Sequence, residues 1–250
     1  MLSIYFFGNT INHSPLSGTL DLSNCRALLG LHCSDNQLVA IDMSGCVALT
    51  SLWCSDNQLT ALDISGCEAL ETIFCDDNRL TTLDISDCTA LSSLMYARNQ
   101  LTKLDPLNCK ALTSLGCDHN QLTALDLSDH RLLESLYCYD NQLSELNISS
   151  CGALETLQSS SNRLTSLDVT DCPRLVNLDC RFNLLTTLDV SDCRSLRELL
   201  CGSNQLTELD VTGCTSLQIL YCTSNNMPSE AAIIGLDKSI TTHINTDWSD

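Results

Sequence analysis

Seventeen cysteines supply the thiols of this 250-residue chain, and their spacing determines which thiol chemistry is open to them. Structural zinc sites need close pairs of the C-x-x-C type, and the sequence has none. The cysteines instead form two columns with a period of 21 residues, and Tyr96, Ser159 and His130 fill the gaps. The first column holds Cys33, Cys54, Cys75, Cys117, Cys138, Cys180, Cys201 and Cys222. The second holds Cys25, Cys46, Cys67, Cys88, Cys109, Cys151, Cys172, Cys193 and Cys214.

Buried thiols are the state that this spacing favours. An unbridged cysteine behaves as a small hydrophobic side chain, and both columns occupy positions that face inward in a repeat. Parallel Cβ vectors within a column disfavour disulfides, and the number of cysteines is odd. We therefore expect reduced, buried thiols, with disulfides and metal binding as weaker alternatives. So many reduced cysteines favour a reducing cytosol or an anaerobic organism.

A column of aspartates also follows the 21-residue period, interrupted once by Asn147. It comprises Asp21, Asp42, Asp63, Asp84, Asp105, Asp126, Asp168, Asp189 and Asp210. We expect each carboxylate to accept from a nearby backbone N–H or from the Ser or Thr two residues later. The alternative is a calcium ladder, helped by neighbouring Asp87, Asp129, Asp171 and Asp192, but the glycine-rich calcium signature is missing.

Catalytic motifs are missing from the sequence. It has no G-x-S-x-G elbow, no phosphate loop and no H-E-x-x-H pair. The five histidines stand in different registers, and the one polar grouping to inspect is His119 with Asp118, Asp140 and Arg98. Because the repeat gives a structural reason for nearly every Ser, Asp and Cys, we expect no enzyme activity, no cofactor and no metal.

Asparagine identifies the 21-residue repeat that positions the cysteine and aspartate columns. It recurs every 21 residues, at Asn36, Asn57, Asn78, Asn99, Asn120, Asn141, Asn162, Asn183, Asn204 and Asn225. Around it the chain reads L-x-x-L-x-C-x-x-N-x-L-x-x-L-D-x-S-x-C-x-x. One unit exposes too much apolar surface to fold alone, so the units must stack into a solenoid. We expect each buried amide to bond the backbone of its own turn and of the adjoining turn.

This nested repeat resembles the IRREKO-type class of bacterial leucine-rich repeats, and the match covers residues 28 to 227. The resemblance implies a leucine-rich-repeat solenoid, α/β-class by convention but built mostly of short parallel β-strands and loops, in a right-handed coil of 21-residue turns. It also implies that the first strand of each turn lines a face that commonly binds proteins. It names no ligand.

Two short strands are expected in each turn. Leu52-Trp53-Cys54 alternates inward and outward with the two-residue period of a strand. The second half of the turn, residues 59 to 67, repeats the same pattern of apolar residues, and this pattern predicts a second parallel strand on the other side of the coil.

We expect one domain over residues 1–250, with irregular ends. Residues 1–27 form an irregular first repeat with an insertion near residues 12–19, and residues 28–227 are regular. Residues 228–250 predict a C-terminal cap, with a short helix after Pro228 and a strand over residues 239–244. No polar cap precedes Met1, which suggests a removed N-terminal segment.

Charge restricts the class of partner. A formal net charge of −19 disfavours nucleic acid, because phosphate binding needs clustered Lys and Arg. The sequence has no apolar run of 18 residues that would indicate membrane insertion, and its first residues do not have the pattern of an export signal. We expect a monomer in the cytoplasm or, if the start is truncated, a secreted or cell-surface protein.

An outward row of large side chains beside the first cysteine column is the candidate ligand site. With neighbouring positions, this surface carries eight of the 11 aromatic residues, Phe7 included. The candidate residues are His32, Trp53, Phe74, Met95, Tyr137, Tyr139, Phe182 and Tyr221, with Asp35, Asp56 and Asp77. Exposed aromatic rows mark interaction sites, so a protein or peptide carrying apolar and basic groups is the expected partner. The alternatives are carbohydrate binding in an adhesion protein and a purely structural row that shields the sheet.

Overall fold

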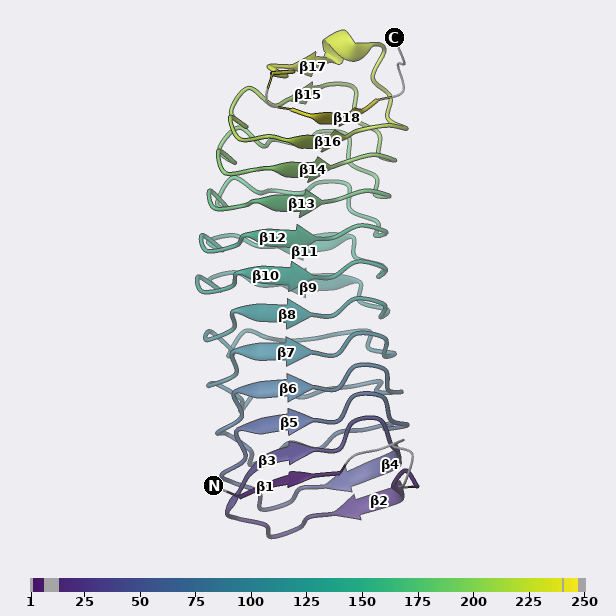
Figure 1. Ribbon diagram of the computed structural model, residues 1–250, viewed down its shortest axis with the longest axis vertical. Coiled ribbons are helices and arrows are strands. Elements are labelled where there is room, and N and C mark those ends of the chain that lie inside the picture. The colour runs from purple at the N-terminus through teal and green to yellow at the C-terminus, as the bar shows by residue number, and fades with distance from the viewer. Residues whose placement is uncertain (1, 7–13, 240, 247–250) are drawn as a thin grey trace. The chain divides into compact units, whose positions relative to one another are not determined.

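The computed structural model describes residues 2–6, 14–239 and 241–246. They fall into two compact units, Met1–Leu122 and Thr123–Asp250, and each unit is a stack of 21-residue turns (Figure 1). No helix among the described residues is long and apolar enough to cross a membrane.

The first unit carries one parallel strand per turn on its principal sheet. In sheet order these strands are β1 (Leu2–Tyr5), β3 (Leu28–His32), β5 (Ser51–Trp53), β6 (Thr72–Phe74), β7 (Ser93–Met95) and β8 (Ser114–Gly116). The register is maintained from turn to turn, so Leu52 pairs with Ile73 and Ile73 with Leu94. These central residues are fully buried, so the residues on either side of them point outward.

The second unit repeats this arrangement. Its principal strands are β10 (Ser135–Tyr137), β12 (Thr156–Gln158), β13 (Asn177–Asp179), β14 (Glu198–Leu200), β16 (Ile219–Tyr221) and β18 (His243–Asn245). They pair in parallel in that order. The expected parallel-sheet solenoid of 21-residue turns is therefore confirmed.

Strands in the second half of the turn are much rarer than the sequence predicts. Among the described residues of the first unit, only β2 (Ser17–Asp21) and β4 (Gln37–Asp42) pair there. In the second unit the pairs are β9 (Ala124–Asp126) with β11 (Glu145–Asn147), and β15 (Leu209–Asp210) with β17 (Ile233–Ile234). In other turns a side chain hydrogen-bonds the backbone of the second half. For example, the Leu59 N–H donates to Asn78 Oδ1 at 2.9 Å.

The asparagine ladder joins successive turns as expected. The Nδ2 atom of Asn78 donates to the carbonyl oxygens of Cys75 and Asp76 in its own turn, at 3.2 and 3.1 Å. It also lies 3.0 Å from the Cys54 carbonyl of the preceding turn. The same pattern recurs at Asn57 and Asn99. Each amide thus provides hydrogen-bond partners for backbone groups that would otherwise be buried without one.

The cysteines line the interior in two columns. None of the 17 forms a disulfide, 16 are buried, and Cys25 is half-buried, which confirms the expected thiol state. Burial raises the pKa of Cys33 and of Cys88 to about 12. A thiol with so high a pKa stays protonated and is a poor nucleophile, so the columns act as core.

The C-terminal segment contains less helix than the sequence predicts. Over the described part of this segment, the only helix is a 3-10 helix at Glu230–Ala232, and the Ser229 side chain does not cap it. The final strand, β18, begins at His243 and pairs with β16. At the other end, part of the insertion expected near residues 12–19 lies outside the described residues, and β2 starts at Ser17.

Candidate functional site

The strand ends of the first unit bring the predicted outward side chains together. In β5 the central Leu52 is buried, and the next residue, Trp53, points away from the core with 40% of its surface exposed. Pairing aligns His32 with Trp53, Trp53 with Phe74, and Phe74 with Met95. Because the strands are parallel and in register, these side chains stack one above another.

Four rings of this alignment touch in sequence, and we call Tyr5, His32, Trp53 and Phe74 the aromatic row. Tyr5 and His32 stack with centroids 4.4 Å apart and planes at 11°. His32 to Trp53 is 4.8 Å at 49°, and Trp53 to Phe74 is 5.0 Å at 40°. The tilt leaves part of the indole of Trp53 open. Burial lowers the pKa of His32, which favours a neutral imidazole in the row.

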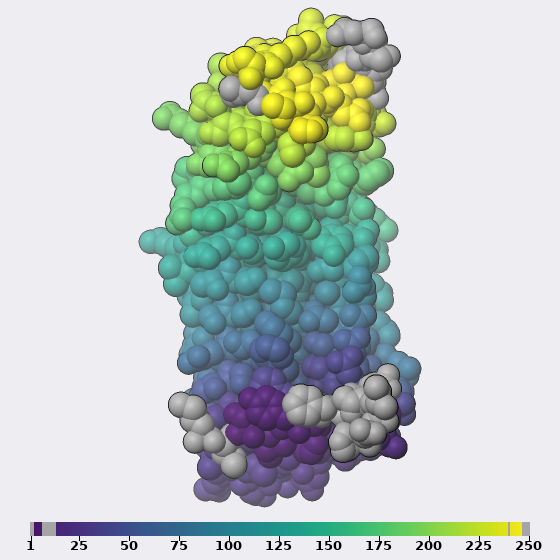
Figure 2. All heavy atoms as spheres, viewed as in Figure 1, coloured from purple at the N-terminus to yellow at the C-terminus, as the bar shows by residue number. Residues whose placement is uncertain are grey.

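Met95 and Gly116 end the aromatic row within this unit. Gly116 pairs with Met95 and has no side chain to extend the row. A Cβ built on Gly116 would lie 2.5 Å from the Met95 Sδ atom, so the thioether lies over the glycine. Side chains cover β5 to β8 without a deep opening (Figure 2). The surface therefore suits a ligand that lies on it rather than one that enters a pocket.

A second row of side chains runs beside the rings, three residues further along each turn. Asp35, Asp56 and Asp77, which we call the acidic row, all have positive φ, between 51° and 58°. Backbone bonds stack these positions: the Asp35 N–H donates to Ser55 O at 3.1 Å, and the Asp56 N–H donates to Asp76 O at 3.0 Å. Arg98 and His119 take the same position in the next two turns.

Like charges dominate the middle of the acidic row. Desolvation raises the pKa of Asp56, the charges of Asp77 and Asp35 raise it further, and Arg98 lowers it. The Arg98 guanidinium lies 3.5 Å from the Asp77 carboxylate at one end of the row. Among the described residues, neither Asp35 nor Asp56 forms an ion pair.

Asp76, which precedes Asp77 in the chain, has a different role. Its carboxylate accepts from the Ala97 N–H at 2.8 Å and from the Ser55 hydroxyl at 3.3 Å. Desolvation is the largest cause of its raised pKa. The side chain joins three turns and is not available to a ligand in the way that Asp56 is.

The candidate residues of the second unit are more dispersed. Tyr137 and Tyr221 stand at equivalent strand ends, but Gln158, Asp179 and Leu200 separate them in the register. Tyr139 is half-buried. Phe182 is 58% exposed at φ 53°, an unusual backbone conformation for a bulky residue. Of the aromatic positions singled out from the sequence, Phe7 lies outside the described residues.

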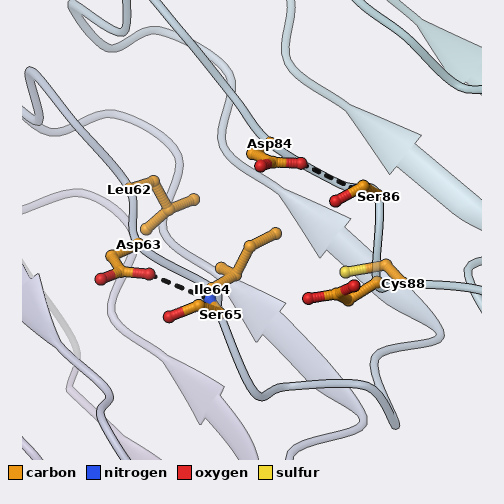
Figure 3. A pocket seen from close by; sticks show the side chains of 8 residues that line it. Leu62, Asp63, Ile64, Ser65, Asp84, Ser86 and Cys88 are labelled. Atoms are coloured by element: carbon orange, nitrogen blue, oxygen red, sulfur yellow. Dashed lines mark hydrogen bonds between the residues drawn. The ribbon is translucent and has the colours of Figure 1, made fainter.

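The aspartate column lies on the other half of the turns and behaves as expected. Asp63 Oδ1 accepts from the Ser65 N–H and Asp84 Oδ1 from the Ser86 N–H, both at 3.0 Å. Hydrogen bonds from those serines lower the pKa of both carboxyls. These residues line a cavity of about 100 Å³ (Figure 3). Within the described ranges, no three His, Cys, Asp or Glu side chains are grouped to hold a metal ion.

In the polar grouping around His119, the histidine and the adjacent Asp118 are not hydrogen-bonded to each other. His119 Nε2 lies 4.0 Å from the Asp118 carboxylate, beyond hydrogen-bond distance. Arg98 is directed to Asp77. Asp140 belongs to the other unit.

Solved structures share this fold. The functional domain of InlJ from Listeria monocytogenes, described as including a cysteine ladder, is 32% identical and superposes with a TM-score of 0.67 over 90% of this chain. The leucine-rich-repeat protein LIC12759 from Leptospira interrogans is 25% identical over 88%, with a TM-score of 0.74. YopM from Yersinia enterocolitica is 27% identical over 88%, also with a TM-score of 0.74. Comparison with family models and with curated protein sequences gives no match.

The chain is a leucine-rich-repeat protein. It spans 56% of the InlJ chain, 60% of the LIC12759 chain and 46% of the YopM chain. The InlJ domain is described as including a cysteine ladder, and this leucine-rich-repeat chain has two columns of buried cysteines. The thiols of this chain therefore pack in the core between successive turns.

Two features of the leucine-rich-repeat surface were not predicted from the sequence. The Asp77–Arg98 ion pair had a visible signal, since the two residues stand 21 positions apart in one register. The Met95 thioether lying over Gly116 had a weaker signal, the single glycine in an outward register of large side chains.

Proposed function

We propose that the first unit is a non-enzymatic binding module whose aromatic and acidic rows dock a protein or peptide with apolar and basic groups. The observation that supports this best is the continuous contact of four rings at an exposed strand face. Tyr5 keeps 54% of its surface exposed and Trp53 keeps 40%. Large rings of this kind supply most of the binding energy in protein interfaces.

A purely structural row is the competing explanation. Neighbouring rings stabilise each other by about 0.5–1.5 kcal/mol per pair, and this alone would shield the sheet. It does not account for the acidic row, because the charges of Asp77 and Asp35 disfavour ionisation of Asp56. A basic partner would use both rows at once, since charge complementarity raises the association rate and selects against wrong partners.

The test is a peptide-display selection on the full chain, followed by affinity measurements on the selected peptides. The variant Trp53→Ala with Phe74→Ala removes the centre of the aromatic row. Its matched control is Val47→Ala with Leu107→Ala, which removes two exposed apolar side chains elsewhere in the same unit. We expect at least about a tenfold loss of affinity in the first variant and less than about a twofold change in the control.

Three results would contradict this function. Undiminished binding by the first variant would leave the rings with only a structural role. Equal losses in both variants would point to nonspecific apolar adhesion. A parallel glycan array that retains the protein through the same rings, without any peptide being selected, would replace the peptide partner with a sugar.

A further inference from the structure

Three successive turns of the first unit carry the same pair of groups, a ring at the strand end and a carboxylate three residues later. The pairs are His32 with Asp35, Trp53 with Asp56, and Phe74 with Asp77. Stacked turns place these pairs roughly 5 Å apart. The pattern stops at the fourth turn, where Arg98 takes the place of the aspartate.

The backbone around the central pair is already hydrogen-bonded, so the open acceptor is the side chain. The Trp53 carbonyl accepts from Cys33 N–H at 2.8 Å, and the Asp56 carbonyl accepts from Asn36 N–H at 3.1 Å. The Asp56 carboxylate forms no ion pair among the described residues, and Asp35 and Asp77 flank it. A cation from outside the chain would relieve this repulsion.

A planar guanidinium fits a ring beside a carboxylate better than an ammonium does. Arginine can stack on an aromatic face and donate two parallel N–H bonds to one carboxylate, whereas lysine acts as a point charge. The chain itself forms such a fork at a strand end of the second unit. There Arg181 Nε and Nη2 donate to the two carboxylate oxygens of Asp179 at 2.9 and 2.8 Å.

We infer that the partner presents arginine side chains to the ring and carboxylate pairs of the first unit, with Trp53 and Asp56 as the central seat. This inference rests on the proposed function and specifies the chemistry of its partner. Each arginine lies along a ring and pairs with the carboxylate of the same turn. The apolar part of its side chain covers the neighbouring ring.

Intrinsic fluorescence can report on this seat directly, because the chain has only two tryptophans. In a Trp248→Phe background of the full chain, the remaining tryptophan emission comes from Trp53. The probes are three blocked decapeptides in which serine alternates with arginine, lysine or citrulline. Citrulline keeps the shape of arginine without its charge, and lysine keeps the charge without the fork.

We expect the arginine peptide to bind about tenfold tighter than the lysine peptide, and the citrulline peptide to leave the emission unchanged. Asp56→Asn should weaken the arginine peptide about tenfold. Asp63→Asn is the matched control: it removes the same charge from an exposed aspartate on the other half of the turn, and should change the affinity less than about twofold.

Two results would overturn the arginine inference. One is equal affinity for the arginine and lysine peptides, and the other is an equal loss in Asp56→Asn and Asp63→Asn, which would mean attraction by net charge alone. The proposed function would survive either result if the Trp53→Ala, Phe74→Ala variant still lost its selected peptides. Undiminished binding of those peptides by that variant would remove the function and the inference together.

Discussion

Removing one rung of the asparagine ladder has an effect that can be worked out bond by bond. Asn78→Ala removes the four hydrogen bonds of the Asn78 side chain. Three of the backbone groups that it bonds are carbonyls, and each of these still accepts from another donor. The Cys54 and Cys75 carbonyls still accept from Asn57 and Asn99 at 3.1 and 3.0 Å. The Asp76 carbonyl still accepts from the Asp56 N–H.

The group left without a partner is the Leu59 N–H, which donates to Asn78 Oδ1 and belongs to a fully buried residue. A buried donor that loses its acceptor costs about 1–3 kcal/mol. We therefore expect Asn78→Ala to lower the free energy of unfolding by that amount. A larger loss would mean that the turns separate, and a negligible loss would mean that water replaces the amide.

Equilibrium urea denaturation measures the free energy, and hydrogen exchange of the Leu59 amide gives a local measure that does not depend on two-state unfolding. Asn108→Ala is the control, because Asn108 is exposed and its side-chain amide donates to Ser86 O at 3.2 Å. We expect it to change stability by less than about 0.5 kcal/mol. Wild-type stability together with unchanged protection at Leu59 in Asn78→Ala would refute the structural role of the ladder.

Two further predictions concern titration and thiol reactivity. The pKa of Asp56 is raised by desolvation and then by Asp77 and Asp35, so affinity for the arginine peptide should fall as pH drops through this raised pKa, and Asp56→Asn should remove that step. Protonation of His32, whose pKa is lowered by burial, would also weaken binding as the pH falls; an unchanged profile in Asp56→Asn would contradict the assignment. For stability the sign is opposite: a carboxyl whose folded pKa lies above its unfolded value costs stability when ionised, so this contribution improves as pH falls through the folded pKa. Iodoacetamide at mildly alkaline pH should label Cys25 before any other cysteine in the native chain and all 17 after denaturation, as counted by mass spectrometry; rapid native labelling of Cys33 or Cys88 would show that the columns are not closed.

Strict periodicity explains why so much of the fold could be predicted from the sequence. Each position in a 21-residue turn meets the same environment as its equivalent in the next turn, so Asn57 and Asn78 must make the same bonds. The outward direction of Trp53 followed from the two-residue period of its strand. The thiol columns followed from the same reasoning.

The prediction of a second strand in every turn was wrong. The spacing of apolar residues in residues 59–67 is that of a strand, but this spacing does not show which group hydrogen-bonds the backbone. Here Asn78 Oδ1 accepts the Leu59 N–H. A side chain from the next turn thus takes part in the bonding that a ladder would use. Asp76 is similar: its sequence position next to Asp77 gave no sign that its carboxylate would bond Ala97 and Ser55.

Equivalent turns of the chain differ in the residue that they carry at the position of the acidic row. The position with positive φ needs a residue that tolerates the left-handed region. In the second unit Asp140 and Phe182 occupy this position in two turns, and serine fills it without any charge at Ser161, Ser203 and Ser224, at φ of 55° to 58°.

The backbone therefore does not require aspartate at this position. Aspartate on three successive turns of the first unit places like charges together: desolvation raises the pKa of Asp56 most, and the charges of Asp77 and Asp35 raise it further. A local cost that brings no structural gain is expected at functional sites. In this unit the cost falls beside the four touching rings, where a basic partner would offset it.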